Sequence, residues 1–143
     1  MENINKYTIL KEQKLVLQIN KGVLKFDEFK KVKINIINDA DFKKNFSFLI
    51  DISNSDVLTT SKGELSLMSN FMSEEFALAT KMKTAVILSM TQVKFAKKYL
   101  SSSNTDYLKY KIFIDTDQAM NWLNIDIPQQ VFVQSELDKL LAQ

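Results

Sequence analysis

The residues of this chain with the clearest potential for chemistry are its carboxylates. Among the seventeen acidic residues, close pairs occur at Asp39 and Asp41, at Glu74 and Glu75, and at Asp115 and Asp117. Two carboxylates brought together can act in general acid/base catalysis. None of the pairs, however, has the spacing, central glycine and terminal glutamate of a calcium-binding EF-hand loop. We interpret Asp39 and Asp41 as residues that end a helix, and Asp115 and Asp117 as residues that cap one. The sequence predicts neither a catalytic residue nor a metal site.

Hydroxyl groups form a second set of candidates, at Thr59, Thr60 and Ser61. Ser61 and Glu64 have the spacing of a capping box, in which serine accepts from a first-turn N–H and glutamate reaches back. A phosphate at a helix N-terminus would also meet free N–H groups and the positive end of the helix dipole. Capping accounts for Ser61, and Thr60 is interpreted as a loop hydroxyl. Both remain candidates for a switch or contact role.

The chain has no histidine, cysteine or arginine, and all nineteen of its basic residues are lysine. A Ser-His-Asp or Cys-His triad, a Cys/His zinc site, a haem ligand and a disulfide are therefore excluded. Without arginine there is no planar fork for a phosphate or carboxylate group. The two glycines, Gly22 and Gly63, are isolated, so there is no glycine-rich phosphate loop. We predict no cofactor.

The formal net charge of +2 is too small to indicate a nucleic-acid partner. Lysines cluster at 30, 31 and 33, at 43 and 44, and at 94, 97 and 98, and we interpret these clusters as solvated faces. The polar first seven residues carry no signal-peptide run. No apolar run approaches the roughly 20 residues that span a bilayer. We expect a cytoplasmic protein with no transmembrane segment.

The first part of the chain has the periodicity of a hairpin and a helix. Two β-type runs, Tyr7–Leu10 and Leu15–Ile19, are separated by polar residues 11–14, which predicts an antiparallel hairpin. Gly22 is expected to end the second strand, and Asp27 to cap a helix. The predicted inner face of this helix consists of Phe29, Val32, Ile36 and Ile37.

Three further strands are predicted. The nearly continuous apolar run Phe46–Ile52 is typical of a strand covered on both faces of a parallel sheet, and a polar loop, 53–60, follows it. Ala85–Leu88 and Ile112–Ile114 are the other two strands. Thr91 is expected to cap the helix between them.

The last part of the chain combines two short helices. Asp115 is expected to cap a helix whose inner face holds Ala119, Trp122 and Leu123. Beyond it, apolar residues flank Pro128 before a helix over 135–142. The alternation of strands and helices predicts one α/β domain over residues 1–124, with a mixed, mostly parallel sheet and helices on its faces, in the order ββαβαβαβα. Residues 125–143 are expected to form a C-terminal extension.

This order of elements resembles the STAS fold of anti-sigma-factor antagonists. Within it, the SpoIIAA-like branch is the better match, because its members end in an aromatic strand, an alanine and Trp-Leu. Here that ending is Ile112-Phe113-Ile114, Ala119 and Trp122-Leu123. The resemblance covers about Tyr7 to Leu123. It implies relatedness in fold to CRAL-TRIO lipid-binding domains.

The resemblance also implies a site. In phosphorylated STAS antagonists, an Asp-Ser at the start of a helix carries the serine that a partner kinase reads. Thr59 stands in place of that aspartate, and the serine position falls on Thr60 or Ser61. This substitution departs from the pattern of the phosphorylated family.

Apolar residues after Ser61 suggest a different function for this part of the chain, the binding of an apolar molecule. The side chains of Met68, Phe71, Met72 and Phe76 fall at helical spacing. They could line an apolar pocket, as the lipid-binding relatives of this fold suggest, or they could form ordinary core.

Three functional hypotheses follow. The first is a non-enzymatic regulatory or protein-interaction module, with an unknown protein partner that contacts the helix after Ser61. The alternative is a carrier of a small apolar molecule or lipid, and the third is an enzyme that uses carboxylates or lysine. Separately, we expect the residues from Ile125 onward to support a homodimer or to pack back onto their own domain.

Overall fold

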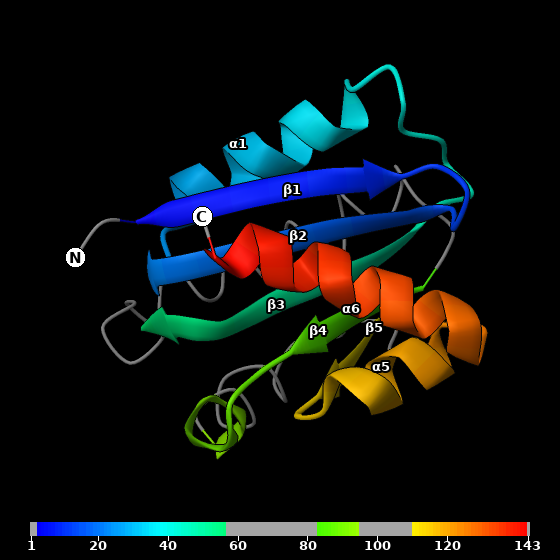
Figure 1. The fold of residues 1–143 in the computed structure, drawn as a ribbon. Helices are drawn as coiled ribbons and strands as arrows, with labels where there is room; N and C mark the ends of the chain where they lie inside the picture. The colour runs from blue at the N-terminus through cyan, green and yellow to red at the C-terminus, as the bar shows by residue number, and fades with distance from the viewer. Residues whose placement is uncertain (1–2, 57–82, 95–109, 143) are drawn as a thin grey trace.

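The computed structural model describes residues 3–56, 83–94 and 110–142 of the chain (Figure 1). The candidate residues Thr60, Ser61, Met68, Phe71, Met72 and Phe76 lie outside this description. In chain order its elements are β1 (Ile4–Leu10), β2 (Leu15–Val23), α1 (Phe26–Ile37), β3 (Ser47–Asp56), β4 (Thr84–Ile87), β5 (Tyr110–Phe113), α5 (Thr116–Trp122) and α6 (Ile127–Ala142). A helical segment also begins at Met90 and is described to residue 94.

The strands form one sheet in the order β1-β2-β3-β4-β5. β1 and β2 pair antiparallel as the predicted hairpin, and β2, β3, β4 and β5 are parallel to one another. The hairpin turn closes with a hydrogen bond from the Lys14 amide to the Lys11 carbonyl, with Lys14 in the left-handed region at φ 52°. The predicted α/β fold with a mixed, mostly parallel sheet is confirmed.

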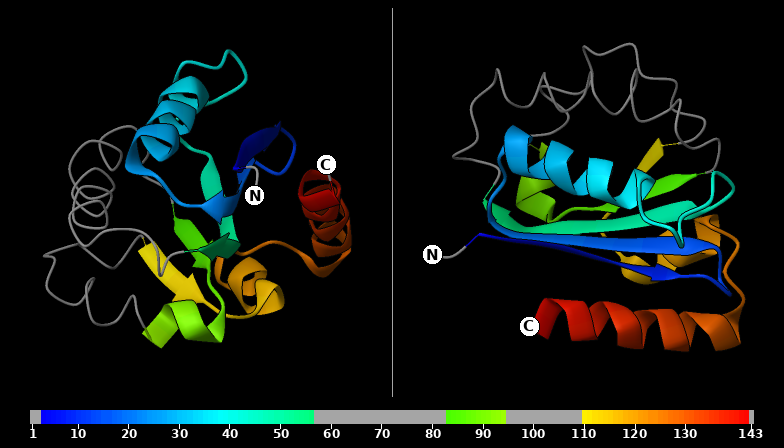
Figure 2. Two further views of the ribbon diagram at one scale, coloured as in Figure 1. Left: turned by 90° about the vertical axis from the view of Figure 1, so that its left-hand side faces the viewer. Right: turned by 90° about the horizontal axis from the view of Figure 1, so that it is seen from above.

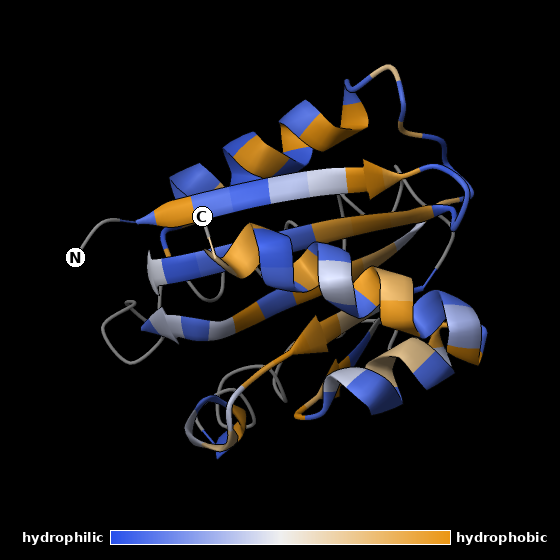
Figure 3. Ribbon diagram, viewed as in Figure 1, coloured by the Kyte–Doolittle hydropathy of each residue, from blue (hydrophilic) through white to orange (hydrophobic). Residues whose placement is uncertain are grey.

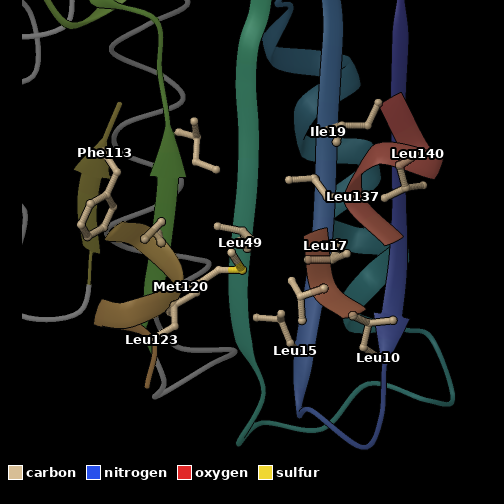
Figure 4. Close-up of a cluster of buried hydrophobic side chains, with 14 residues drawn as sticks. Leu10, Leu15, Leu17, Ile19, Leu49, Phe113, Met120, Leu123, Leu137 and Leu140 are labelled. Atoms are coloured by element: carbon tan, nitrogen blue, oxygen red, sulfur yellow. The ribbon is translucent and has the colours of Figure 1, made fainter. Parts of the chain in front are cut away.

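Helices cover both faces of this sheet (Figure 2). Side chains alternate along each strand, so β2 directs Leu15, Leu17 and Ile19 to one face and Val16 to the other. The first face packs against α5 and α6, where Met120, Leu123, Leu137 and Leu140 meet the strands (Figure 4). The second face packs against α1, through Phe29 and Ile36. The two buried clusters place the core on both sides of the sheet.

The C-terminal residues form one long helix, which corrects the predicted helix over 135–142. α6 begins at Ile127, and Pro128 lies in its first turn, where the missing N–H costs no intrahelical bond. Val133, Leu137 and Leu140 are buried against the sheet, so the segment packs back onto its own strands. The Lys21 ammonium donates to the carbonyl of Leu141 near the C-terminal end of α6, where the helix dipole favours a cation.

Two predicted strand ends were wrong. Gly22 does not end β2, which continues to Val23 with Gly22 at φ 87°, a conformation that glycine adopts without strain. β3 likewise continues to Asp56 through residues expected to be loop. A register irregularity between Ile19 and Lys21 accompanies this extension.

The first helix differs from its prediction at two residues. α1 begins one residue before Asp27, and its N-cap is Lys25, which makes no side-chain capping bond. Asp27 instead adds a negative charge to the first turn. Lys33, predicted to be solvated, is fully buried, with its ammonium 4.5 Å from the ring centroid of Phe48. Phe29 and Ile36 are buried on the predicted inner face.

Within the described residues, no helix is long and apolar enough to cross a membrane.

Candidate functional site

The predicted switch residues and the predicted pocket residues belong to the part of the chain outside the description. Thr60 and Ser61 follow the last residue of β3, Asp56, by only a few positions in sequence. The described part of the structure that precedes them in sequence is therefore the end of β3. It lies at the edge of the sheet where the parallel strands β2, β3, β4 and β5 end. We call this the carboxyl edge. In open α/β sheets, ligands commonly bind at this edge.

The carboxyl edge is polar. Figure 3 shows β2 and β3 changing from apolar residues where they begin to hydrophilic residues where they end. Several polar side chains of these strands and of the helical segment at 90–94 are buried, namely Gln18, Asn20, Asp51, Ser55 and Gln92. Buried polar groups need hydrogen-bond partners, so the partners of these groups define what the edge can do.

Gln92 is the centre of a network that joins β3 to the helical segment at 90–94. Its amide nitrogen donates to the carbonyls of Ile52, at 2.8 Å, and Ser55, at 2.6 Å. Its amide oxygen accepts from the backbone N–H of Ser89 at 2.8 Å, while the Ser89 hydroxyl accepts from the backbone N–H of Gln92 at 3.2 Å. This is a capping box. Ser89 therefore caps this helix, and the prediction of Thr91 as the cap was wrong.

Serine side chains of β3 form further hydrogen bonds at the carboxyl edge, both to β2 and within β3. The Ser55 hydroxyl donates to the side-chain oxygen of Asn20 at 2.7 Å, which ties β3 to β2. The carboxylate of Asp51 accepts from both the backbone N–H and the hydroxyl of Ser53, at 2.9 and 2.6 Å. All these contacts hold backbone in place.

Two apolar side chains are exposed just beyond the ends of β4 and β5. Met90 is 59% exposed at the start of the helical segment, and Ile114 is 52% exposed directly after β5. The backbone N–H of Leu88 donates to the carbonyl of Phe113 at 2.8 Å, so the two strand ends are adjacent. The carboxyl edge thus combines a hydrogen-bonded backbone with exposed apolar side chains.

The described acidic pairs have structural roles, as interpreted from sequence. Asp115 caps α5 and accepts from the backbone N–H of Asp117 at 2.8 Å. Asp39, beyond the end of α1, accepts from the backbone N–H of Asp41 and from the hydroxyl of Tyr7. The backbone N–H of Asp41, then the Tyr7 hydroxyl, hold the pKa of Asp39 below its usual range. Among the described residues, no group of three or more acidic, His or Cys side chains could hold a metal ion.

Sequence reasoning missed Gln92 and Lys33. A signal for Gln92 was present, because Ser89-Met90-Thr91-Gln92 has the same capping-box spacing as Ser61 and Glu64. Lys33 carried no comparable signal. It lies four residues after Phe29 and three before Ile36, on the inner face of α1, but lysine is almost never fully buried.

Comparison with known proteins identifies the fold family of this structure. No protein-family model matches the chain, and no curated protein matches it. An uncharacterised protein of the DUF3478 family from Shewanella loihica PV-4, whose crystal structure has a SpoIIAA-like fold, superposes with a TM-score of 0.54. The match covers 86% of this chain and 96% of that chain, at 17% sequence identity. This chain has a SpoIIAA-like fold. At that identity the likeness concerns the fold alone.

In this chain, α6 also has exposed apolar side chains. Ile127 and Val131 are more than 70% exposed, at 76% and 72%, and Phe132 is 40% exposed. Ile127 and Val131 line an open groove between α5 and α6, together with Met120 and the carboxylates of Asp117 and Asp138. This face lies opposite α1 on the SpoIIAA-like sheet (Figure 2).

Proposed function

We propose that the protein is a non-enzymatic regulatory or protein-interaction module, which binds a protein partner at the carboxyl edge of its sheet. The observation that carries this proposal is the exposure of Met90 and Ile114 where β4 and β5 end. Exposed apolar side chains beside a polar rim are suited to protein contacts. The buried polar groups beside them, in Gln92 and Ser55, are occupied in fixing the backbone.

Composition supports the same proposal. Histidine, cysteine and arginine are absent from the whole sequence, which removes the usual nucleophile–base pairs and the bidentate phosphate grip. The resemblance to STAS antagonists implies a protein that acts by being bound. The end of β3 is part of the carboxyl edge, and the candidate switch residues Thr60 and Ser61 follow it by only a few positions in sequence.

The contact surface is tested by partner capture with matched variants. Met90→Asp and Ile114→Asp each place a charge in the proposed contact, and aspartate is favourable in the first turn of the helix at Met90. Ile34→Asp, at a residue 42% exposed on α1, is the control. We expect a partner retained by the unmodified protein and by Ile34→Asp to be lost from both edge variants. A partner retained equally by all four proteins would contradict the assignment of the surface.

The switch residues need a separate test, because Ser61 is also expected to be a helix cap. Ser61→Asn keeps a good N-cap but removes the hydroxyl, and Thr60→Val removes the other hydroxyl while keeping its shape. Incubation with the captured partner and ATP, read by intact mass, should add a phosphate to the unmodified protein and none to the double variant. If the unmodified protein never gains a phosphate, the switch role of Thr60 and Ser61 is contradicted, and the proposal of a binding module stands without it.

The alternative of a carrier for a small apolar molecule or lipid stays a prediction, since Met68, Phe71, Met72 and Phe76 lie outside the described residues. Saturable binding of a fatty acid to the delipidated protein would favour it.

A further inference from the structure

Three side-chain amides lie together on the α1 face of the β1–β2 hairpin. Asn5 and Asn20 are directly opposite each other in the strand register. Gln18 is two residues before Asn20, so its side chain leaves β2 on the same face. Gln18 and Asn20 are each 1% exposed. Asn5 is half-buried, but its amide nitrogen is buried. We call these three residues the amide cluster.

The hydrogen bonds of the amide cluster leave part of it unsatisfied. The Gln18 amide nitrogen donates to the side-chain oxygen of Asn5 at 3.4 Å, and the Ser55 hydroxyl donates to that of Asn20 at 2.7 Å. The amide nitrogens of Asn5 and Asn20 and the amide oxygen of Gln18 are buried without a hydrogen-bond partner among the described residues. A buried polar atom with no partner costs about 1–3 kcal/mol. Three such atoms in neighbouring positions indicate a shared partner.

The chemistry of that partner follows from the unsatisfied atoms. Two are donors and one is an acceptor, so a complementary molecule accepts two hydrogen bonds and donates one. The near-complete burial of Gln18 and Asn20 restricts it to a very small molecule. All three side chains are neutral amides, so they offer no charge to balance an anion.

We propose that the amide cluster is an internal water-binding site, in which one ordered water links Asn5, Gln18 and Asn20. A water molecule accepts two hydrogen bonds and donates two, and buried waters typically make about three bonds to otherwise unsatisfied groups. The bound water cross-links β1 to β2 beneath α1 and continues, through Asn20 and Ser55, into the Gln92 network of the carboxyl edge. This inference is independent of the proposed function.

Two measurements on the full chain test the site. A crystal structure that resolves ordered solvent should place a water about 3 Å from the Gln18 oxygen and from both asparagine nitrogens. In solution, NMR cross-relaxation between water and the side-chain NH₂ groups of Asn5 and Asn20 should have the sign of a long-lived bound water.

A variant pair shows whether Gln18 is part of the site. Gln18→Met nearly keeps the side-chain volume but removes the acceptor, so the water signals at Asn5 and Asn20 should weaken or disappear. Gln134→Met, on α6, should leave them unchanged. The proposal is overturned if Gln18 bonds directly to Asn20, if another group of the protein fills the position, or if the density belongs to a larger molecule.

Discussion

Lys33 lies on the inner face of α1, with its ammonium over the ring of Phe48 in β3, and its burial makes stability depend on pH. Burial lowers the pKa of Lys33 well below its usual range, whereas an unfolded lysine titrates near 10.4. Between the two pKa values the unfolded chain binds more protons than the folded chain, so the free energy of unfolding rises with pH across this window. We expect Lys33→Met to flatten that slope and to raise the free energy of unfolding at neutral pH, because methionine has no charge to remove from water.

Urea unfolding of Lys33→Met from about pH 6 to about pH 10 measures both effects. Lys31→Met, at an exposed residue of the same helix, is the control and should change stability by less than about 0.5 kcal/mol. A Lys33→Met protein that was less stable than the unmodified protein across this range would contradict the prediction.

Asp39 also makes stability rise with pH, but in an acidic pH range. Its pKa is lowered by the backbone N–H of Asp41 and, to a smaller extent, by the hydroxyl of Tyr7, 2.8 Å away. Because the folded pKa lies below the unfolded one, the stabilisation is present above the unfolded pKa and is lost as pH falls through the folded pKa. We expect Tyr7→Phe to raise the pKa of Asp39 toward its usual value, as measured by NMR titration of the carboxyl carbon. An unchanged titration curve would mean that the Tyr7 hydroxyl has no influence on the carboxylate.

At the scale of elements, the Gln92 network explains how the end of β3 is held against the helical segment at 90–94. Gln92→Leu would leave the carbonyls of Ile52 and Ser55 and the N–H of Ser89 without this partner. We expect a loss of roughly 2–4 kcal/mol in the free energy of unfolding. Ser89→Ala removes only the cap and should cost about 1 kcal/mol. Equal losses in the two variants would show that the bonds to β3 contribute nothing.

α6 provides a second test at this scale. Leu137 is buried against the sheet, whereas Val131, on the same helix, is 72% exposed. Leu137→Ala should therefore lower the free energy of unfolding by about 2–5 kcal/mol, and Val131→Ala by less than about 0.5 kcal/mol. Thermal or urea unfolding measures both. A small effect at Leu137 would show that α6 is not packed on the sheet in solution.

Some helix and strand boundaries could be predicted from local sequence patterns, and others could not. Asp115 was predicted as a cap because its signal is local, an aspartate followed by helix-forming residues. The start of α6 was missed because the helix was expected to begin only at Ser135, although proline is favoured in a first turn and Pro128 lies there. The continuation of β3 to Asp56 depends on pairing with β2, a long-range contact that residues 53–56 do not encode by themselves.

At the scale of the whole molecule, the order of strands and helices and the terminal phrase Ile112–Leu123 were enough to predict the SpoIIAA-like fold, because adjacency and right-handed crossovers leave few topologies. The candidate site was not predictable in the same way. The carboxyl edge is assembled from Asn20, Ser55 and Gln92, which are distant in sequence and ordinary in type. Only the three-dimensional arrangement brings them together.

The homodimer expected from residues 125–143 becomes a sharper prediction at this scale. Three apolar residues of the segment are buried against the sheet of the same chain and cannot contact a second copy. They are Val133, Leu137 and Leu140. A dimer through α6 would therefore rest on its exposed residues Ile127, Val131 and Phe132. Truncation after Asn124 cannot test this, since it would also remove part of the core.

Two point variants on α6 separate association from folding. If α6 mediates the dimer, Val131→Glu places a charge in the contact and should shift the protein from dimer to monomer in sedimentation velocity, with little change in unfolding. Lys139→Glu, which breaks an exposed pair with Glu136 on the same helix, is the control for added negative charge and should remain dimeric. An unmodified protein that sediments as a monomer at high concentration would show that this face serves no self-association. A dimer that Val131→Glu leaves intact would place the contact on another surface of the molecule.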